Sequence, residues 1–303
     1  MNTISYFYYM ELDHLRTLIA AVETGSLTGA ARRRSLTQPA ISLQVKALEQ
    51  ELGGPLFHRR GRGVVLTQTG QVLYEHAREI LTRVRTARAE VAEVLGLGRG
   101  VLRLGVTDAA ATRILPRTFA RFHRRHPEIE VQVSVHPTAG LIERLQRGEI
   151  DLGVGTLPAA GDTSPDLEIR FLERETLGLV APAEAGRVPL DALLERYPFI
   201  AYPRGSTTRG LIDRALAAAG LIARPRMEIG RPDVMIRLVE AGLGAAVLPR
   251  DVSEPAAQRG TVYRPSPRRF RLERRLGLIR LTGRSLDPAA RAFAAMIVEG
   301  TEE

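Results

Sequence analysis

Amide and hydroxyl side chains gather at the start of one predicted helix. Gln38, Ser42 and Gln44 follow Thr37 in the segment TQPAISLQVKALEQELG, whose apolar spacing turns Gln38 and Ser42 outward. A glutamine amide can form two hydrogen bonds with the edge of adenine, and a serine hydroxyl can reach bases or phosphates. The segment therefore suits a helix whose first turn enters the major groove of DNA. The alternative is a solvated helix end that binds nothing.

Arginines and glycines alternate shortly after this helix. Residues 56–67 predict a β-hairpin whose tip carries Arg60 and Arg62 among glycines, with Arg59 just before them. Glycines let the backbone turn, and arginines pair with phosphates or enter a narrow minor groove. Residues 32–62 contain seven Lys or Arg residues against two acidic ones. Such a hairpin would lie along DNA, although a solvated basic turn has the same composition.

Hydroxyl-bearing residues also follow three apolar runs in the later part of the chain. Thr107 and Thr138 each follow such a run, as does the group Ser206, Thr207 and Thr208, and a predicted helix begins at each place. Helix N-termini attract anions, and ligand pockets are clefts with a few convergent polar groups. We therefore expect these side chains to face a binding cleft. Each has a plainer alternative as a helix cap.

Two short helices joined by a tight turn must position the first group of residues. Ser26 can cap a helix that runs to about Arg33, and Thr37 can cap the next one. Pro39 falls just inside the second helix, where N–H groups have no acceptor within the helix, so proline costs little there. The apolar stripe of this helix, which we expect to be buried, consists of Ala40, Ile41, Val45 and Leu48.

A long helix is predicted over residues 69–95, before the glycine-rich stretch 96–100. Its apolar positions recur at alternating spacings of four and three, which is typical of helices that pair along a heptad seam. A dimer would cover the seam and place two DNA-binding helices on one face, which predicts a roughly palindromic site. The alternative is packing against the chain's own later domain. The seam consists of Leu73, Ala77, Ile80, Val84, Ala87, Val91 and Val94.

Short apolar runs alternate with helical patterns from residue 101 to residue 299. This alternation predicts an α/β fold with largely parallel strands, divided into two lobes. We expect the chain to cross between the lobes near 174–178 and 275–277, and a final helix from about Asp287 to return to the first lobe. The predicted strands are Val101–Val106, Glu130–Val135, Asp151–Gly155, Gly178–Ala181, Phe199–Tyr202, Arg226–Ile229 and Ala245–Leu248, with helices at Leu115–His126, Leu141–Arg147, 208–219 and 234–241.

Composition sets further limits on the class of protein. The chain has 303 residues, no cysteine, a net charge of +9 and a sequence pI of about 10.6. The missing cysteines exclude disulfides and thiolate chemistry, and the basic charge favours an anionic partner. No apolar run is long enough to span a membrane, and the N-terminus is a poor signal peptide. We therefore expect a cytoplasmic protein, with residues 1–9 as a disordered extension and Met10 as a candidate start.

The segments GSLTGAA (25–31), LTQPAISLQVKALEQELGGPLF (36–57) and RRGRGVVLTQTG (59–70) resemble the winged helix-turn-helix of the LysR-type transcriptional regulators. The pattern from Gly100 to Pro249 is similar to the effector domain of the same family. This resemblance implies a winged helix-turn-helix over residues 10–68 and a linker, or dimerisation, helix over 69–96. A two-lobed α/β effector domain like type 2 periplasmic binding proteins would follow over 100–300. Lobe I would comprise about 100–174 and 277–300, and lobe II about 175–276.

The resemblance also implies partners and roles. The partners would be double-stranded DNA, a small-molecule effector such as a small organic acid, and a second copy in a homodimer or homotetramer. RNA polymerase is a further candidate partner, whereas no metal or cofactor is implied. The DNA-binding residues would be Ser26, Thr37, Gln38, Pro39, Ser42, Leu43, Gln44, Lys46, Arg59, Arg60 and Arg62. The effector-binding residues would be Thr107, Asp108, Ala109, Thr138, Ser206, Thr207 and Thr208.

The sequence departs from the family pattern at several positions. Arg34 stands where the family usually has an apolar residue, so packing near the turn should differ. Leu43 stands where many members carry arginine, so a base pair there would be read differently or through a thymine methyl group. Ala109 replaces a hydroxyl found in several members. Asp108 would disfavour a carboxylate nearby unless Arg204 or Arg209 offsets its charge.

Two other classes of function remain as alternatives. A solute-binding protein with a helical dimer arm would need export, which the missing signal peptide disfavours. An enzyme would need a catalytic constellation, and none is visible. His123 and His126 lie one helical turn apart but lack a third metal ligand nearby. Gly153 and Gly155 follow a dinucleotide-like spacing, but Pro158 replaces its third glycine.

Overall fold

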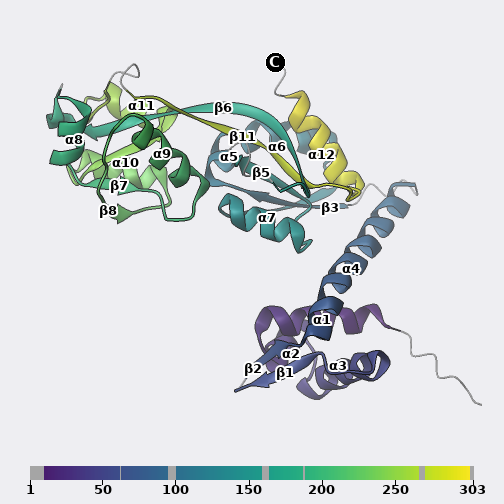
Figure 1. Ribbon diagram of the computed structural model, residues 1–303. Helices are drawn as coiled ribbons and strands as arrows, with labels where there is room; N and C mark the ends of the chain where they lie inside the picture. The colour runs from purple at the N-terminus through teal and green to yellow at the C-terminus, as the bar shows by residue number, and fades with distance from the viewer. Residues whose placement is uncertain are drawn as a thin grey trace, which may run out of the picture. The chain divides into compact units, whose positions relative to one another are not determined.

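A computed structural model describes residues 10–61, 63–94, 100–158, 164–186, 188–265 and 270–300. The chain divides into two compact units, residues 1–97 and 98–303, which are described separately (Figure 1). Among the described residues, no helix is both long enough and apolar enough to cross a membrane. The predicted extension at residues 1–9 lies outside the described part of the chain.

The first unit is a helical domain with a small hairpin. Its second and third helices begin where the sequence predicts, because each has a hydroxyl cap. The Ser26 hydroxyl accepts a hydrogen bond from the Gly29 N–H at 2.9 Å, and the Thr37 hydroxyl accepts one from the Ala40 N–H at 3.4 Å. The elements are α1 (Leu12–Thr24), α2 (Leu27–Arg34), α3 (Gln38–Leu52), β1 (Phe57–Arg60), β2 (Gly63–Leu66) and α4 (Gln68–Val94).

The core of this unit joins α1 and α3 to the start of α4, and a second cluster packs Ala30 and Ala31 of α2 against α1 and α3. Ile41, Val45 and Leu48 of α3 are buried as the apolar spacing predicts, whereas Ala40 is only half-buried. The central cluster consists of Leu15, Leu18, Leu48, Leu56, Leu73, Tyr74 and Ala77. Leu73 and Ala77, the first two positions of the heptad seam, are therefore covered by their own domain. Their spacing is explained without a second chain.

The rest of the seam presents a different environment. Ile80, Ala87, Val91 and Val94 are exposed and Val84 is half-buried. Val94, the last residue of this 27-residue helix, is 87% exposed. Isolated apolar residues on a surface are normal, but a row at heptad spacing has a specific use in helix pairing.

The second unit is a two-lobed α/β domain, as predicted. Lobe I contains β3 (Gly100–Val106), α5 (Asp108–Arg113), α6 (Leu115–Arg125), β4 (Ile129–Val135), α7 (Thr138–Gln146), β5 (Leu152–Thr156) and α12 (Pro288–Glu299). Lobe II contains α8 (Leu190–Arg196), β7 (Phe199–Ala201), α9 (Thr207–Ala218), β8 (Pro225–Glu228), α10 (Pro232–Glu240), β9 (Ala245–Pro249), α11 (Arg250–Gln258) and β10 (Val262–Tyr263). Two long strands, β6 (Leu167–Pro182) and β11 (Leu272–Leu281), belong to both lobes.

The two long strands join the lobes and pair antiparallel over the whole of β11 and over residues 167–177 of β6 (Figure 1). The strand order among the described residues is β4-β3-β5-β11-β6-β9-β7-β8, with β10 beside β6. Within each lobe the remaining pairs are parallel, namely β3 with β4 and β5, and β7 with β8 and β9. β11 pairs with β5 of lobe I through 276–279, and β6 pairs with β9 of lobe II through 177–180. The chain therefore crosses between the lobes within β6 and β11.

Each lobe has its own hydrophobic core. In lobe I, Phe122 of α6 packs edge-on against Phe293 of α12 with ring centroids 5.2 Å apart. The Asp287 carboxylate caps α12 by accepting from the Ala290 N–H at 2.8 Å, and this final helix packs in the core of lobe I. The core of lobe II surrounds Phe199 and Val247. Separate cores allow the two lobes to behave as bodies joined by the two long strands.

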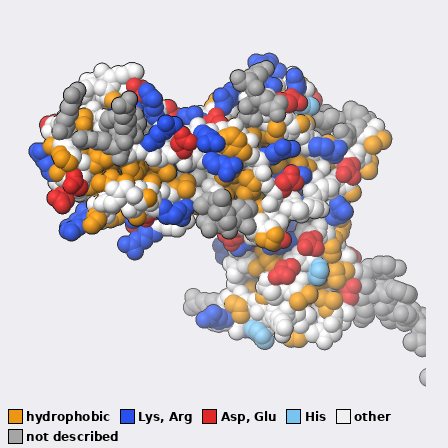
Figure 2. Space-filling view, turned by 45° about the horizontal axis from the view of Figure 1, so that its top comes forward, with side chains coloured by type: hydrophobic (Ala, Val, Ile, Leu, Met, Phe, Trp, Pro, Cys, Tyr) orange, Lys and Arg blue, Asp and Glu red, His pale blue; other side chains and the backbone are white. Residues whose placement is uncertain are grey.

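The surface of the larger unit carries interspersed charges. On the face seen in Figure 2, arginine side chains of this unit alternate with Asp and Glu side chains and form no single continuous basic area. Many arginines of this unit pair with a neighbouring carboxylate, as Arg250 does with Glu254 at 3.0 Å. This distribution agrees with the sequence, in which the concentrated positive charge lies within residues 32–62.

Candidate functional site

The N-terminal turn of α3 offers polar and apolar groups to solvent. Gln38 is exposed and donates from its side-chain nitrogen to the Ser42 hydroxyl at 2.9 Å. This contact fixes the direction of the amide at the helix end. Leu43 keeps 68% of its side-chain exposure, and Lys46 is exposed one turn beyond Ser42. Pro39 is exposed as well, at the start of the helix.

Gln44 has a different setting from its neighbours. Its side-chain oxygen accepts a hydrogen bond at 2.5 Å from the hydroxyl of Thr17, a residue of α1 with no exposed surface. The buried hydroxyl needs a partner, because an unpaired buried polar group is costly. The Gln44 carbonyl oxygen therefore ties α3 to α1, and Gln38 is the better candidate for base contact. The sequence could not reveal this, because the partner lies 27 residues away.

The β1–β2 hairpin is held against the helical domain. The Val64 N–H donates to the Gly25 carbonyl at 2.9 Å, and a Cβ added at Gly63 would approach that carbonyl oxygen to 2.7 Å. Glycine is therefore needed at position 63 for the close approach. Arg59 and Arg60 are exposed on β1, and Arg62 lies outside the described residues. The anchored hairpin presents two exposed arginines next to its tip.

An ion pair occupies the place where Arg34 departs from the family pattern. A terminal nitrogen of Arg34 lies 2.6 Å from the carboxylate of Asp13 in α1. This hydrogen bond lowers the pKa of Asp13 below its ordinary value. At this position an ion pair between α1 and α2 therefore stands where the family pattern has an apolar residue.

A cavity of about 370 Å³ lies between the lobes of the second unit. Its walls are the carboxyl ends of β3, β4 and β7 and the helix starts that follow them. Every predicted effector-binding residue lines it, namely Thr107, Asp108, Ala109, Thr138, Ser206, Thr207 and Thr208. Tyr202, His136 and Arg274 line it too, although the sequence did not single them out as ligand-binding residues.

Two hydroxyl groups of this cavity have no internal partner. The hydroxyl oxygens of Thr107 and Tyr202 are buried and form no hydrogen bond with the residues that the structure describes. Burial raises the pKa of the Tyr202 phenol from 10.0 to about 12, and the nearby Arg274 guanidinium opposes this only in part. Gly155 makes room for Thr107, because a Cβ there would meet the threonine methyl at 2.5 Å. Gly155 is therefore needed for packing at the cavity, and it is not part of a dinucleotide-binding motif.

The other cavity hydroxyls are already engaged within the protein. The sequence predicted that Thr138 caps α7, but the capping position is occupied by Pro137. The Thr138 hydroxyl donates instead to the Thr156 carbonyl at 2.9 Å, because its side chain points to the end of β5. The Ser206 hydroxyl caps α9 by accepting from the Arg209 N–H at 3.1 Å. Thr208 accepts from Arg274 at 3.0 Å.

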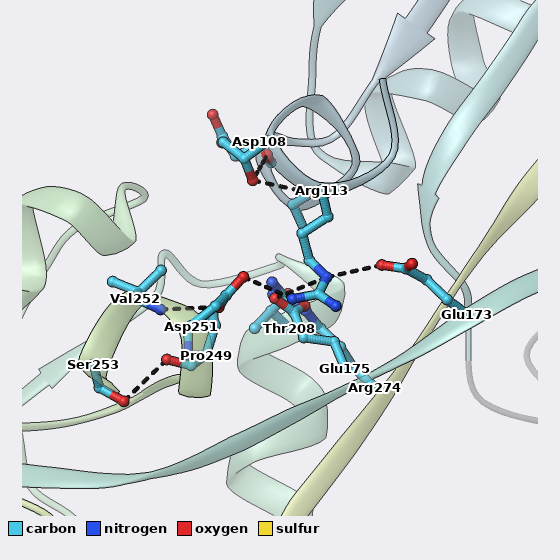
Figure 3. A network of polar contacts seen from close by, with 12 residues as sticks. Asp108, Arg113, Glu173, Glu175, Thr208, Pro249, Asp251, Val252, Ser253 and Arg274 are labelled. Atoms are coloured by element: carbon cyan, nitrogen blue, oxygen red, sulfur yellow. Dashed lines mark hydrogen bonds and ion pairs between the residues drawn. The ribbon is translucent and has the colours of Figure 1, made fainter. Parts of the chain in front are cut away.

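A buried ion pair stands beneath the cavity. Arg274 of β11 pairs with Glu175 of β6, and each side chain is only 3% exposed (Figure 3). The same guanidinium donates to Thr208, so it connects both crossing strands to the start of α9. In the sequence, the only signal for this pair is one acidic and one basic residue, each within a segment that forms a strand. Sequence reasoning missed it because the partners lie 99 residues apart.

A second arginine links the lobes directly. The Nε atom of Arg113, at the end of α5 in lobe I, lies 2.8 Å from Glu173 of β6. One of its terminal nitrogens lies 2.7 Å from Asp251 of α11 in lobe II (Figure 3). Burial of the Arg113 guanidinium disfavours its charged form. The hydrogen bonds to the two carboxylates have the larger combined effect, so the pKa of Arg113 is raised. The helix that begins at Asp108 in the cavity therefore ends in an ion pair between the lobes.

The two arginines expected to offset Asp108 are committed elsewhere. Arg204 pairs with Glu228 at 3.3 Å, and Arg209 pairs with Asp213 at 2.8 Å. The carboxylate of Asp108 itself is exposed and forms no hydrogen bond or ion pair within the described part of the chain.

His136 of the cavity wall favours its neutral form. Burial lowers the pKa of its imidazole, and the charge of Arg144 adds to the effect.

A winged helix-turn-helix followed by a two-lobed domain with a ligand-sized cavity defines a ligand-responsive DNA-binding regulator. Comparison with known proteins gives the family. Residues 12–71 match the bacterial regulatory helix-turn-helix of the lysR family, and residues 96–302 match the LysR substrate binding domain. The chain therefore belongs to the LysR family of DNA-binding transcriptional regulators, which is not a family of enzymes.

Individual relatives agree with this assignment. A probable RuBisCO transcriptional regulator from Nostoc sp. is 30% identical over 296 residues, covering 95% of this chain and 87% of the relative. Full-length OxyR from Pseudomonas aeruginosa shares the fold with a TM-score of 0.67 and 22% identity, covering 95% of each chain. The structure of full-length CbnR complexed with its target DNA has a TM-score of 0.64 and 23% identity, covering 96% of this chain and 99% of that one.

Proposed function

We propose that this regulator binds a roughly palindromic promoter site as a dimer or tetramer and responds to an effector in the cavity between its lobes. The observation that carries the DNA-binding part is the exposed turn of α3. Gln38, Leu43 and Lys46 all reach solvent there, and the hairpin adds Arg59 and Arg60. A helix start with such residues can read base edges, while arginines on a hairpin contact phosphates or the minor groove.

The proposed effector is a small organic acid or a related metabolite. In support, α7 and α9 both begin at the cavity wall, and the N–H groups of a first helical turn have no acceptor within the helix. The unpaired hydroxyls of Thr107 and Tyr202 provide two further polar groups. A cytoplasmic location follows from the proposed role, because the promoter is there. RNA polymerase is a candidate partner at that promoter.

Transmission from effector to DNA is proposed to run through the lobes and the long helix. A ligand that contacts both lobes would favour one arrangement of them, in proportion to its preference for that arrangement. Paired α4 helices would then change the spacing of the two DNA-binding domains. Equal DNA bending and equal footprints with and without an effector would contradict this mechanism.

The roles in DNA binding can be separated with two substitutions. Gln38→Ala should reduce the discrimination between operator and scrambled DNA by about 1–3 kcal/mol, because a base contact is lost. Arg60→Ala, as the matched control, should weaken both DNAs alike and lower the slope of log affinity against log salt by about 1. Fluorescence anisotropy at several salt concentrations measures both quantities. Intact discrimination in Gln38→Ala would show that α3 has been placed wrongly on DNA.

The target promoter can be sought at two places. Regulators of this family are conveniently tested first on the DNA upstream of their own gene. The relatives' description as RuBisCO regulators makes a RuBisCO promoter the second DNA to test.

A further inference from the structure

The charges that line the cavity leave one group without a partner. The charged side chains in its wall are Asp108, Arg204 and Arg274. Both arginines already hold a carboxylate, Glu228 in one case and Glu175 in the other. Asp108 forms no ion pair among the described residues, although the charge of Arg231, which itself pairs with Asp233 at 2.7 Å, interacts with it, and His136 favours its neutral form. A ligand therefore meets an uncommitted anion in this wall and no uncommitted cation.

The wall formed by lobe II has the opposite character. α9 begins at Thr207 and has 12 residues, and its Ser206 cap accepts from Arg209. The N–H groups of Thr207 and Thr208 belong to the first helical turn, where they lack an intrahelical acceptor and carry a partial positive charge. An anionic group of a ligand is stabilised at such a position without a guanidinium.

Two buried hydroxyls provide an independent sign that a ligand belongs here. Thr107 is 8% exposed and Tyr202 is 5% exposed, and both line the cavity. Neither oxygen makes a hydrogen bond of ordinary geometry in the described structure, although the Arg274 guanidinium lies close to the Tyr202 phenol. A buried hydroxyl without such a bond costs free energy unless something in the cavity supplies one. A protonated phenol and a threonine hydroxyl both donate, and both can therefore bond to a carboxylate oxygen.

We propose that the effector is an α-amino acid, bound as a zwitterion with its carboxylate at the start of α9 and its ammonium group at Asp108. The assignment rests on the proposed effector cavity and narrows the ligand within it. A dicarboxylate would bring a second negative charge toward Asp108, and like charges that close repel. An uncharged sugar would leave the partial positive charge of α9 without an anion. A ligand with both charges satisfies both walls.

The size of the cavity agrees with this class of ligand. A volume of about 370 Å³ falls at the small end of ligand pockets, which span about 300–1,000 Å³. Pro137, Pro203 and Pro232 in the wall provide apolar surface for a side chain beyond the two charged groups. This surface would select among amino acids.

The test uses the purified full-length protein and a ligand panel. Thermal unfolding is followed with each of the common L-amino acids, with dicarboxylates, with neutral sugars and with sugar phosphates. Each amino acid that raises the unfolding temperature is then compared, by isothermal titration calorimetry, with the 2-hydroxy acid of the same side chain. We expect at least one amino acid to bind and its 2-hydroxy acid to bind on the order of tenfold more weakly, because the charge-assisted bond to Asp108 is lost.

Two variants locate the effect at the proposed residue. Asp108→Asn keeps the shape of the side chain but removes its charge, and should weaken amino acid binding on the order of tenfold. Asp191→Asn is the matched control, because Asp191 is also an exposed acid in the first turn of a short helix, yet lies outside the cavity wall. The Asp191→Asn variant should bind the amino acid with the affinity of the wild type. Unliganded unfolding temperatures of both variants show whether each remains folded.

The outcomes separate the two levels of the hypothesis. Binding confined to dicarboxylates, sugars or sugar phosphates would overturn the zwitterion while leaving the effector cavity in place. Amino acid binding that Asp108→Asn leaves unchanged would also overturn it. No response in any arm of the panel would contradict both the zwitterion and the effector cavity. The ligand comparison on the wild-type protein distinguishes these cases even if a variant fails to fold.

Discussion

The buried pair of Arg274 and Glu175 should be the most sensitive ionic contact of the effector domain. Both side chains are 3% exposed, and Arg274 also donates to Thr208. Arg274→Met would fill similar space but leave the Glu175 carboxylate without its cation in a buried site. Breaking such a pair on one side costs about 3–5 kcal/mol, because the remaining charge is uncompensated.

The expected shift is large enough for calorimetry. For a domain of 150–250 residues, a change of 1 kcal/mol moves the unfolding temperature by roughly 2–4 °C, so the effector-domain transition of Arg274→Met should fall by roughly 6–20 °C. Differential scanning calorimetry of the full chain measures that transition. Arg280→Met is the matched control, since Arg280 also lies on β11 and pairs with Glu168 of β6, but those side chains are 33% and 44% exposed. An exposed pair contributes about 0–1 kcal/mol, so the control should shift little.

A double variant distinguishes the loss of charge balance from the loss of packing. Replacing both partners, by Arg274→Met together with Glu175→Leu, should recover much of the lost stability, since two apolar side chains need no charge partner. If Arg274→Met lowered the transition no more than Arg280→Met, the burial of the pair would carry no energetic weight and the reasoning would be refuted.

Three further properties can be tested. Val91→Glu together with Val94→Glu should dissociate the proposed dimer into monomers, as measured by light scattering. Val72→Glu, on the same helix but off the seam, should leave the dimer intact. If the dimer survived the double substitution, its interface would have to lie elsewhere. Leu43→Ala should lower the preference for one thymine-containing base pair in a binding-site selection by about 1–3 kcal/mol, and an unchanged preference profile would exclude a thymine-methyl contact. Tyr202 has a folded-state pKa of about 12 against an ordinary 10.0, so the stability it contributes is present below pH 10 and is lost as the pH rises toward 12. Absorbance at alkaline pH should therefore show a late tyrosine that Tyr202→Phe removes, and an identical titration of both proteins would contradict its burial.

Local signals predicted the helix boundaries of the first unit well. The starts of α2 and α3 depend on hydroxyl caps at Ser26 and Thr37, and such caps act within three residues along the chain. Most strands of the second unit were likewise visible as apolar runs bounded by loops, but β10 and β11 were not predicted as strands. The full length of β6 was not predicted, because charged residues such as Glu173 and Arg174 interrupt its apolar pattern.

Contacts between distant residues set the limit of the prediction. The heptad spacing of α4 fits both a dimer seam and packing within the domain, and Leu73 takes the second role. Gln44 bonds to Thr17, and Thr138 bonds to the end of β5, although each looked like a residue available for a ligand. The cavity itself was predicted as three helix starts, but the ion pair of Arg274 requires the register of two strands that are far apart in sequence.

Sequence-specific DNA binding is the property to measure first. Fluorescence anisotropy would compare the wild-type protein on the DNA upstream of its own gene and on a scrambled duplex of equal length, at two salt concentrations. Base readout by α3 predicts a large preference for the upstream DNA that persists at the higher salt, because nonspecific contacts weaken with salt while base contacts keep their discrimination. Weak and equal binding that disappears with salt, both there and at a RuBisCO promoter, would contradict it and leave only a basic surface that meets a polyanion.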